Sequence, residues 1–347
     1  LSYPNNLSTR ALMSNMKKGC RVVFTDLDGT LLGSDQKLSN RNRQTLEDLG
    51  QQNIARVVIT GRSLLSCDRV INENFPIDFL VTSSGAGIFS HQPRELIHHF
   101  GLAVPEIKTA IDVLKNLKMD FMVHDPVPDN HQFYWYRFGS KNPDFDRRLA
   151  LYSSHHQKLT DLTQLKEGSA QLLSIETSKN ASARLQELRD KLPAYSVLRA
   201  TSPLDHASTW YEIFPPNVSK SQAAQWICNA FGVDSATALA IGNDFNDIDM
   251  LRWAPFARVV SNAPSPLTEE FFSVAAHDKN GLSEAVSYWL GQTHKGQLPI
   301  HNHQSSSPLI KAAEREVSGL LKKSSAGECS INRPLWRNMT STATRRT

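Results

Sequence analysis

Residues 22–32 read Val-Val-Phe-Thr-Asp-Leu-Asp-Gly-Thr-Leu-Leu, and this stretch decides the fold. Its first four residues form an apolar run typical of a strand that is buried on both faces of a parallel sheet. Two carboxylates, Asp26 and Asp28, follow at once, and Gly29 then opens a loop. Such a pair is also common in surface turns and at helix caps. Because ligands bind outside the carboxyl ends of parallel strands, we interpret it as a site where one carboxylate attacks and the other exchanges a proton.

Four further apolar runs have the same character, at residues 57–60, 79–82, 238–241 and 259–260. Each ends in small polar residues, and helical patterns lie between them. Ser39 is a suitable N-cap for a helix that runs to about residue 51, and Gly232 is a suitable end for a helix over 219–231. The sequence therefore predicts a Rossmann-like α/β core with a parallel sheet, whose polar strand ends meet at one edge.

The stretch from residue 88 to 216 differs from this core pattern. It combines helical patterns at 105–117 and 181–192 with strand-like runs at 119–124, 133–138, 171–176 and 210–214. We therefore expect a core at 21–87 and 217–291 with an inserted α+β domain at 88–216, which the family resemblance described below implies to be a cap domain. Residues 1–20 are predicted to be a disordered segment, and 292–347 a basic low-complexity tail with a short helix at 309–323.

Composition narrows the class of protein. The chain has 347 residues, of which 40% are hydrophobic and 21% charged, as in globular proteins. No apolar run reaches the roughly 18 residues of a membrane span, and residues 1–20 lack the apolar region of a secretory signal. The segments 1–20 and 292–347 carry net charges of +3 and +6. Since the whole chain carries +4, residues 21–291, which we call the body, carry −5. An acidic body argues against nucleic-acid binding, and four scattered cysteines fit a cytoplasmic protein.

Four motifs in order give the chain a recognisable family resemblance. They are residues 26–32, Ile-Thr-Gly-Arg at 59–62, Pro-Asn-Val-Ser-Lys at 216–220, and Ile-Gly-Asn-Asp-Phe-Asn-Asp at 241–247. Over about 21–290 the chain resembles haloacid dehalogenase (HAD) superfamily phosphatases of the Cof-type subfamily IIB, which have a C2B cap. Sucrose-phosphate phosphatases and phosphomannomutases share that architecture. The resemblance implies the same capped α/β fold and a small phosphorylated substrate.

The resemblance also implies roles for individual residues. Asp26 would be the nucleophile that forms an aspartyl-phosphate, with its other oxygen on Mg²⁺. Asp28 would be the general acid and then the base, with its main-chain carbonyl also on the metal. Residues implied to bind the phosphate or substrate are Leu27, Thr60, Gly61, Arg62, Lys220 and Asn246. Of these, Thr60 and Lys220 belong with Asp26 and Asp28 to the catalytic set.

Elementary chemistry agrees with these roles. Phosphoryl transfer needs positive charge around the reacting group, which one Mg²⁺ and one lysine supply. An alkoxide leaves poorly unless it is protonated, so an aspartate at position 28 favours a phosphatase or a mutase over an ATPase. Each residue also has a simpler interpretation. Thr60 and Gly61 could form a plain turn, Lys220 could be a solvated lysine at a helix start, and Asp247 or Asp249 could complement a helix dipole. With the Asp26–Asp28 pair present, we favour function for Thr60, Lys220 and Asp247, but not for Asp249.

The fourth motif departs from the family pattern, because Asn243 stands where the first metal-binding aspartate is expected. An asparagine can still offer a carbonyl oxygen to Mg²⁺, and Asp244 or Asp247 could supply the missing charge. Which of the three binds the metal stays open at this point. In the cap, the aromatic run at 133–138 could stack on a sugar ring, but a cap strand with two alternating faces is favoured. Trp210 and His206 are weaker candidates for substrate contact.

The sequence thus predicts a Mg²⁺-dependent phosphatase of a small metabolite, with a sugar phosphate as the favoured substrate. A phosphomutase, similar to phosphomannomutase, would use the same Asp26 and Asp28 but need a bisphosphate activator. A non-catalytic protein that binds a partner through its cap or basic tail is the third alternative. Asn243 and the residues after 291 are its only support.

Overall fold

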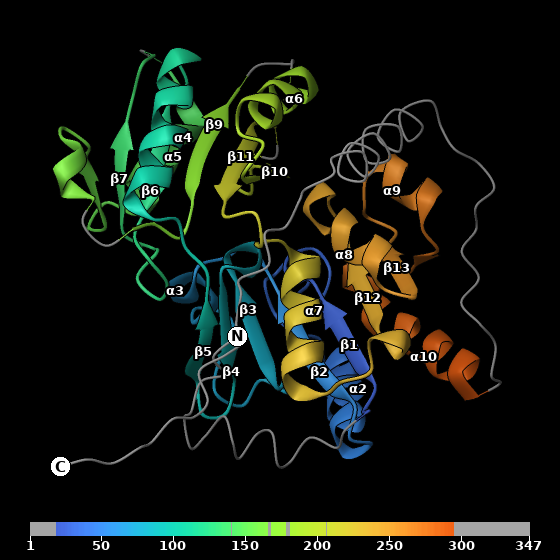
Figure 1. Cartoon of the computed structure of the whole chain (residues 1–347). Helices are drawn as coiled ribbons and strands as arrows, with labels where there is room; N and C mark the ends of the chain where they lie inside the picture. The colour runs from blue at the N-terminus through green and yellow to red at the C-terminus, as the bar shows by residue number, and fades with distance from the viewer. Residues whose placement is uncertain (1–18, 140, 166–167, 178–180, 206, 295–347) are drawn as a thin grey trace, which may run out of the picture. The chain divides into compact units, whose positions relative to one another are not determined.

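The structure is a computed structural model that describes residues 19–139, 141–165, 168–177, 181–205 and 207–294. No helix in this part of the chain combines the length and the apolar character needed to cross a membrane. The tail helix expected at 309–323 and the segment 1–18 lie outside the described residues. Figure 1 shows the core sheet with its helices and, above it, the smaller sheet of the insertion.

An eight-stranded sheet forms the core, and β1, the strand that precedes Asp26, lies in its middle. The order across the sheet is β14-β13-β12-β1-β2-β3-β4-β5, parallel from β14 to β3 and antiparallel at β4 and β5. The strands are β1 (Val22–Thr25), β2 (Ala55–Ile59), β3 (Phe79–Thr82), β4 (Gly87–Ser90), β5 (Glu95–His99), β12 (Leu239–Gly242), β13 (Phe256–Val260) and β14 (Ser273–Val274). The five predicted apolar runs all lie in or overlap these strands.

Helices cover both faces of the core sheet. On one face α2 and α10 pack against alternate strand residues, with Leu46, Trp289 and Val58 in a single buried cluster. On the other face α7, α8 and α9 do the same, with Ile227 and Phe24 in a second cluster. This arrangement confirms the predicted α/β class, because strands between two helical layers must be apolar on both faces. The helices are α2 (Asn40–Gln51), α3 (Leu64–Cys67), α7 (Lys220–Phe231), α8 (Ile248–Trp253), α9 (Ser265–Glu270) and α10 (Gly281–His294).

The predicted helix ends agree with the structure. Ser39 caps α2 by accepting a hydrogen bond from the Asn42 main-chain N–H. The helix predicted over 219–231 is α7, which begins at Lys220 with Ser219 as its N-cap. It ends at Gly232, whose φ of 65° is left-handed and therefore suits glycine. The N-cap places Lys220 in the first turn of the helix, beside the carboxyl edge of the sheet.

The insertion has its own six-stranded sheet, in the order β10-β11-β9-β6-β7-β8. Its helices α4 and α6 cover one face of this sheet, and α5 packs on the other. The elements are α4 (Val104–Asn116), β6 (Phe121–His124), β7 (Phe133–Tyr136), α5 (Pro143–Leu151), β8 (His156–Lys158), β9 (Leu172–Glu176), α6 (Ala181–Lys191), β10 (Ser196–Thr201) and β11 (Thr209–Phe214). We call this unit the cap.

The structure differs from the sequence prediction at two boundaries. Residues 88–99, which the sequence assigns to the insertion, mostly form β4 and β5 of the core sheet. The reason is a tight turn after β3, where Ser83 and Ser84 have φ values of 49° and 54° and the chain returns antiparallel to β3. The insertion proper therefore runs from α4 to β11. At the other end, the core pattern continues past residue 291, because α10 extends to His294.

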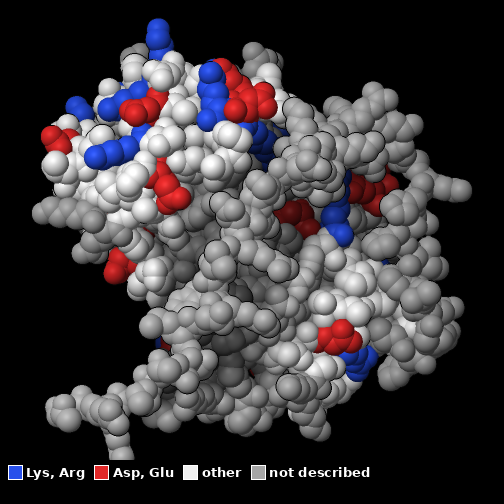
Figure 2. Space-filling model, in the orientation of Figure 1, with Lys and Arg blue, Asp and Glu red and all other residues white. Residues whose placement is uncertain are grey.

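The surface of the cap carries charges of both signs. On the face shown in Figure 2, the coloured Lys and Arg side chains of the cap are interspersed with Asp and Glu side chains. Mixed surfaces of this kind produce no strong field of one sign. The charges that matter for chemistry lie inside, where the cap meets the carboxyl edge of the core sheet.

Candidate active site

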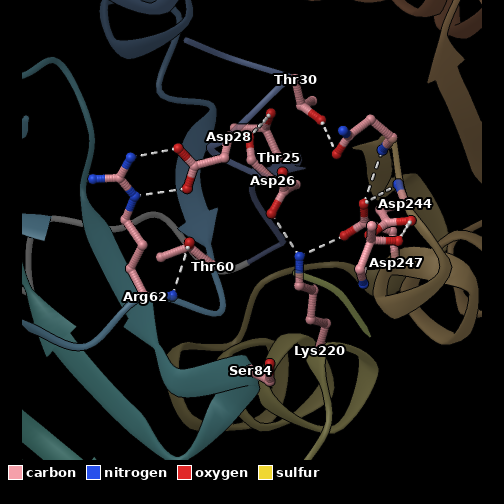
Figure 3. A network of polar contacts seen from close by, with 12 residues as sticks. Thr25, Asp26, Asp28, Thr30, Thr60, Arg62, Ser84, Lys220, Asp244 and Asp247 are labelled. Carbon is pink, nitrogen blue, oxygen red and sulfur yellow. Dashed lines mark hydrogen bonds and ion pairs between the residues drawn. The ribbon is translucent and has the colours of Figure 1, made fainter. Parts of the chain in front are cut away.

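A buried lysine joins two carboxylates at the carboxyl edge of the core sheet (Figure 3). Lys220 Nζ donates to Asp26 Oδ1 at 2.6 Å and to Asp247 Oδ1 at 2.5 Å. The lysine and Asp247 are fully buried, and Asp26 is 5% exposed. The three residues come from the end of β1, the start of α7 and the 3₁₀ turn Phe245–Asp247, and so from distant parts of the sequence.

The electrostatics of this cluster depend on burial and on the two carboxylates together. Burial opposes the charge of Lys220, but Asp247 and Asp26 outweigh it and raise the pKa of the lysine. For Asp26 burial is the larger effect: it raises the pKa of the carboxyl to about 7, against the lowering effect of Lys220 and with a further increase from Asp247. The lysine is thus held as a cation beside a carboxylate whose negative charge burial disfavours.

Asp247 also organises the loop after β12. Its Oδ2 accepts the main-chain N–H groups of Asn243 at 2.8 Å and Asp244 at 3.0 Å, while its Oδ1 accepts from Lys220. Both oxygens of Asp247 are therefore used within the protein. Asp244 has turned toward the cap, where its carboxylate lies 3.4 Å from the main-chain N of Thr201. Neither carboxylate is directed at Asp26 in the way that Asn243 is.

The Asn243 side chain lies among oxygen atoms that could hold a cation. One end of its amide is 3.2 Å from Asp26 Oδ2, 3.1 Å from the Asp28 main-chain carbonyl oxygen and 3.0 Å from Thr30 Oγ1. When the amide nitrogen occupies this end, it donates to the two oxygens. When the amide oxygen occupies it, this oxygen lies about 3 Å from each of the other two, close to the separation of neighbouring ligands around an octahedral Mg²⁺ with bonds of about 2.1 Å.

The donor set therefore fits a hard divalent cation. Carboxylate, main-chain carbonyl and amide oxygens are ligands that Mg²⁺ accepts, and the metal usually keeps several waters besides. Among the residues that the structure describes, no group of three or more His, Cys, Asp or Glu side chains is arranged to hold a metal. A site made of Asp26, Asn243 and the Asp28 carbonyl has only one such side chain, so the two observations agree.

The side chain of Asp28 is held by an arginine. Arg62 donates from Nε to Asp28 Oδ2 at 2.7 Å and from a terminal nitrogen to Oδ1 at 2.5 Å. The same guanidinium donates to Gln36 at 2.9 Å and to the Ser66 carbonyl at 3.1 Å. A two-pronged pair of this kind fixes the plane of the carboxylate. Arg62, which the sequence places in the phosphate-binding set, is thus directed at Asp28.

The remaining predicted residues lie around the same edge. Thr60 follows β2, is 1% exposed and accepts the main-chain N–H of Arg62 at 3.2 Å. Gly61 and Asn246 line the cavity beside it. Leu27 is different, because its side chain is fully buried in the core. Only the main chain of Leu27 faces the site's loop, where its carbonyl accepts the N–H groups of Leu31 and Leu32.

A cavity of about 870 Å³ joins the core and the cap above these residues. Its size is within the range of small-molecule sites. The cap contributes His124, Asn130, Arg148, Gln171, Trp210 and Glu212 to its lining, and the core contributes Asp26, Asp28, Thr60, Gly61, Arg62 and Asn243, among others. Asn130 donates to Ser83 Oγ at 2.6 Å, and Ser84 Oγ donates to Glu212 at 3.2 Å, so the turn after β3 connects the cap to the core.

Sequence reasoning missed most of the cap side of this cavity. Arg148 lies on α5, a helix for which Asn142-Pro143-Asp144 is a recognisable start signal, since Asn142 caps it and Pro143 occupies its first turn. Trp210 was expected as a contact and does line the cavity, whereas His206 lies outside the described residues. The aromatic run from residue 133 does not line the cavity but forms β7, with Phe133 in one hydrophobic cluster of the cap and Tyr134 against the other.

The fold and the carboxylate–lysine cluster define a class of capped α/β hydrolases. Residues 23–286 match the family model of the haloacid dehalogenase-like hydrolases, so the chain belongs to this family. The Cof-type resemblance carried by the four motifs is thereby confirmed.

The chain matches several proteins over almost the entire length of those proteins. The chain is 25% identical over 287 residues to the HMP-PP phosphatase of Cronobacter sakazakii, with 80% of this chain and 99% of the relative covered. It resembles the structure of the HAD phosphatase BT1666 from Bacteroides thetaiotaomicron (TM-score 0.64, 19% identity, 78% and 95% covered). It also resembles the HAD subclass IIB sugar phosphatase BT4131 (TM-score 0.59, 18% identity, 80% and 99% covered). The two structures show that the fold is shared, and the family assignment together with the curated phosphatase relatives identifies the chain as a phosphatase.

Proposed function

We propose that this phosphatase hydrolyses the phosphomonoester of a small metabolite, a sugar phosphate, with Mg²⁺ and an aspartyl-phosphate intermediate. The observation that carries the proposal is the buried Asp26, held by Lys220 at 2.6 Å and open to the cavity between core and cap. The similarity to BT4131, which is described as a sugar phosphatase, supports a sugar phosphate as the substrate. A cytoplasmic location fits the three cysteines in the described residues, all of which are free thiols.

The chemistry assigned to the side chains is a double displacement. An Asp26 oxygen attacks phosphorus, the bond from phosphorus to the leaving alkoxide oxygen breaks, and Asp28 gives that oxygen its proton. Asp28 then takes a proton from water, whose oxygen attacks the phosphorus of the aspartyl-phosphate and releases inorganic phosphate. Lys220 balances the charge on Asp26, and Thr60, the Gly61 N–H and Asn246 are the proposed contacts to the phosphate oxygens.

Asp26, Asn243 and the Asp28 carbonyl are the proposed holders of Mg²⁺, with Asp247 orienting the loop that carries Asn243. The metal would supply positive charge for the phosphate oxygens. Arg62 has the role of a positioning residue, because its two hydrogen bonds direct the Asp28 carboxyl. The cap over the cavity would shield the bound substrate from bulk water.

The test is phosphate release from p-nitrophenyl phosphate and a panel of sugar phosphates, with Mg²⁺ or with EDTA. Asp26→Asn should reduce release by at least about 1,000-fold, since it removes the nucleophile. Asp112→Asn, on the exposed side of α4, is the control and should retain activity. Acid quenching during turnover should trap a phosphoryl group on the peptide that contains Asp26.

Two results would contradict the proposal. Phosphate release that persists in EDTA would exclude the metal requirement, and release that persists in Asp26→Asn would exclude the nucleophile. Transfer of phosphate between positions of the substrate, without net release and only with a bisphosphate activator, would establish the mutase alternative.

A further inference from the structure

On the cap side of the cavity, an arginine lies close to three aromatic rings. The Arg148 guanidinium carbon lies 4.6 Å from the ring centre of Trp210, 5.2 Å from that of Tyr152 and 5.8 Å from that of Phe133. Arg148 also lines the cavity that contains Asp26. Contacts of this kind involve the faces of the rings and do not require the N–H groups of the guanidinium to bind a carboxylate.

The acidic groups near Arg148 have other partners. Asp144 accepts the indole N–H of Trp210 at 2.7 Å, and Glu212 accepts the hydroxyl of Ser84 at 3.2 Å. Within the residues that the structure describes, Arg148 forms no ion pair, and its Nε is buried without a hydrogen-bond partner. The neighbouring Arg147 is the opposite case, being 54% exposed and paired with Asp205 at 3.4 Å.

The polar contact that Arg148 does make is to a neutral group. One of its terminal nitrogens lies 3.5 Å from His124 Nε2. His124 donates from Nδ1 to the Asn130 carbonyl at 2.7 Å, so Nε2 is the acceptor nitrogen. Burial, reinforced by Arg148, lowers the pKa of His124 to about 3. Burial also lowers the pKa of Arg148, since the attraction of Tyr152, Glu212 and Asp144 is too weak to offset it.

Arg148 is partly buried, with its Nε fully so, and it forms no ion pair with any described residue. Such a cation is costly to desolvate, and a ligand anion that reaches it is correspondingly favoured. We propose that Arg148 binds a second anionic group of the substrate, a carboxylate or a second phosphate, while the phosphate to be hydrolysed lies at Asp26. This inference rests on the proposed function and narrows its substrate class to sugar phosphates or related polyol phosphates that carry a further negative charge. One cavity lined by both residues is the geometric basis.

The chemistry of the surrounding cap residues suits such a substrate. Gln171 Oε1 and Asn130 Oδ1 are buried without a hydrogen-bond partner, and both residues line the cavity. Amide oxygens accept hydrogen bonds from hydroxyl groups, as a polyol would offer between its two anionic ends. The Arg148 fork is complementary to a carboxylate or phosphate, which it can bind through two parallel hydrogen bonds.

The experiment measures binding to the Asp26→Asn protein, so that no turnover is needed. Two ligand pairs are compared by calorimetry in Mg²⁺: 3-phosphoglycerate against glycerol 3-phosphate, and fructose 1,6-bisphosphate against fructose 6-phosphate. In each pair the members differ by the second anionic group. We expect the anionic member of at least one pair to bind about 10- to 100-fold more tightly, the range of a charge-assisted hydrogen-bonded pair. The pair that responds distinguishes a carboxylate from a second phosphate.

Variants at position 148 then assign the preference. Arg148→Gln should reduce the ratio of the two dissociation constants to about threefold or less, and Arg148→Lys, which keeps the charge, should restore part of it. Arg147→Gln is the matched control and should keep the full ratio. Circular dichroism verifies that each variant is folded. The first comparison uses the Asp26→Asn protein with Arg148 in place, so it tests the preference for the anionic ligands even if a variant at position 148 does not fold.

Two outcomes would overturn the inference. One is equal binding of both members in both pairs. The other is a ratio that survives Arg148→Gln, and if both members then lose affinity equally, Arg148 would be assigned to packing alone. The proposed function fails differently, through absence of phosphate release by the unmodified protein. In that case the binding ratios still decide whether Arg148 recognises an anion.

Discussion

Replacement of Asp247 by asparagine tests whether the buried ion-pair cluster holds Lys220 for catalysis. Asp247 is fully buried, and its two oxygens accept from Lys220 and from the main chain of the loop after β12. Asparagine keeps the size of the side chain but removes the charge, and its NH₂ group then faces either the lysine or a main-chain N–H. Asp249→Asn is the matched control, since the same change is made two residues along, at a partly exposed carboxylate.

The expected magnitudes differ because burial differs. Removal of one partner from a buried ion pair costs about 3–5 kcal/mol, and we expect the lower end because Lys220 keeps its bond to Asp26. For a protein of this size, with about 2.1 cal/mol/K of unfolding entropy per residue, about 3 kcal/mol corresponds to a fall in Tm of about 4–5 °C. Asp249 accepts the Ser221 main-chain N–H at 2.9 Å, which an amide oxygen can still do, so Asp249→Asn should cost less than about 1 kcal/mol.

The assay compares thermal unfolding and steady-state phosphate release for both variants. Asp247→Asn should lower kcat by about 100-fold, since a displaced lysine no longer balances the charge on the nucleophile. The KM should change less than kcat, because Asp247 does not line the cavity. Equal Tm and equal kcat in the two variants would refute the reasoning and leave the Asp247–Lys220 contact without a functional role.

Two further predictions concern the loop after β1 and a buried histidine outside the site. Gly29→Ala should weaken Mg²⁺ binding by about tenfold and lower the free energy of unfolding by about 1–2 kcal/mol, because Gly29 has a φ of 69° and an added Cβ would lie 2.6 Å from the Asn243 amide. Gly19→Ala is the control, since Gly19 has a similar φ of 74° but an added Cβ would have nothing within 4 Å. Calorimetry should show that this control leaves the Mg²⁺ affinity unchanged. Burial, with a contribution from Arg94, lowers the pKa of His91 to about 4. As the pH falls, His91 is therefore protonated in the unfolded chain before it is protonated in the folded one. The contribution of His91 to the free energy of unfolding is complete above about pH 6.5 and is lost as the pH falls toward 4. The free energy of unfolding should therefore fall by up to about 1.4 kcal/mol per pH unit more steeply in the unmodified protein than in His91→Gln, and parallel curves would contradict the prediction.

Much of the core could be predicted because its signals are local. A strand between two helical layers must be apolar throughout, so the runs at residues 22–25 and 79–82 indicate strands without any knowledge of their neighbours. Ser39 and Gly232 mark helix ends through the conformations of their own main chains. The motif residues were located by the same local signals, because each follows a strand or begins a helix within a few residues, but their proposed roles came from the family resemblance.

The contacts within the site could not be predicted in this way. The bond from Lys220 to Asp26 spans 194 positions of sequence, and that from Arg62 to Asp28 spans 34. No local pattern distinguishes an arginine that contacts phosphate from one that directs a neighbouring carboxylate. Asn243 and Asp244 are likewise adjacent in sequence, but the loop geometry imposed by Asp247 turns one toward Asp26 and the other toward the cap.

By itself, the sequence determined the α/β class and the strand-end position of the candidate site, and its family resemblance implied which carboxylates are proposed to react. Those properties follow from periodicity, from capping and from motifs that each occupy a few consecutive residues. Only the tertiary structure decided which carboxylates share Lys220, what Arg62 holds, and that Arg148 of the cap forms no ion pair with a described residue. The physical reason is that charge and burial at one point depend on every element packed around that point, and those elements are far apart in the chain.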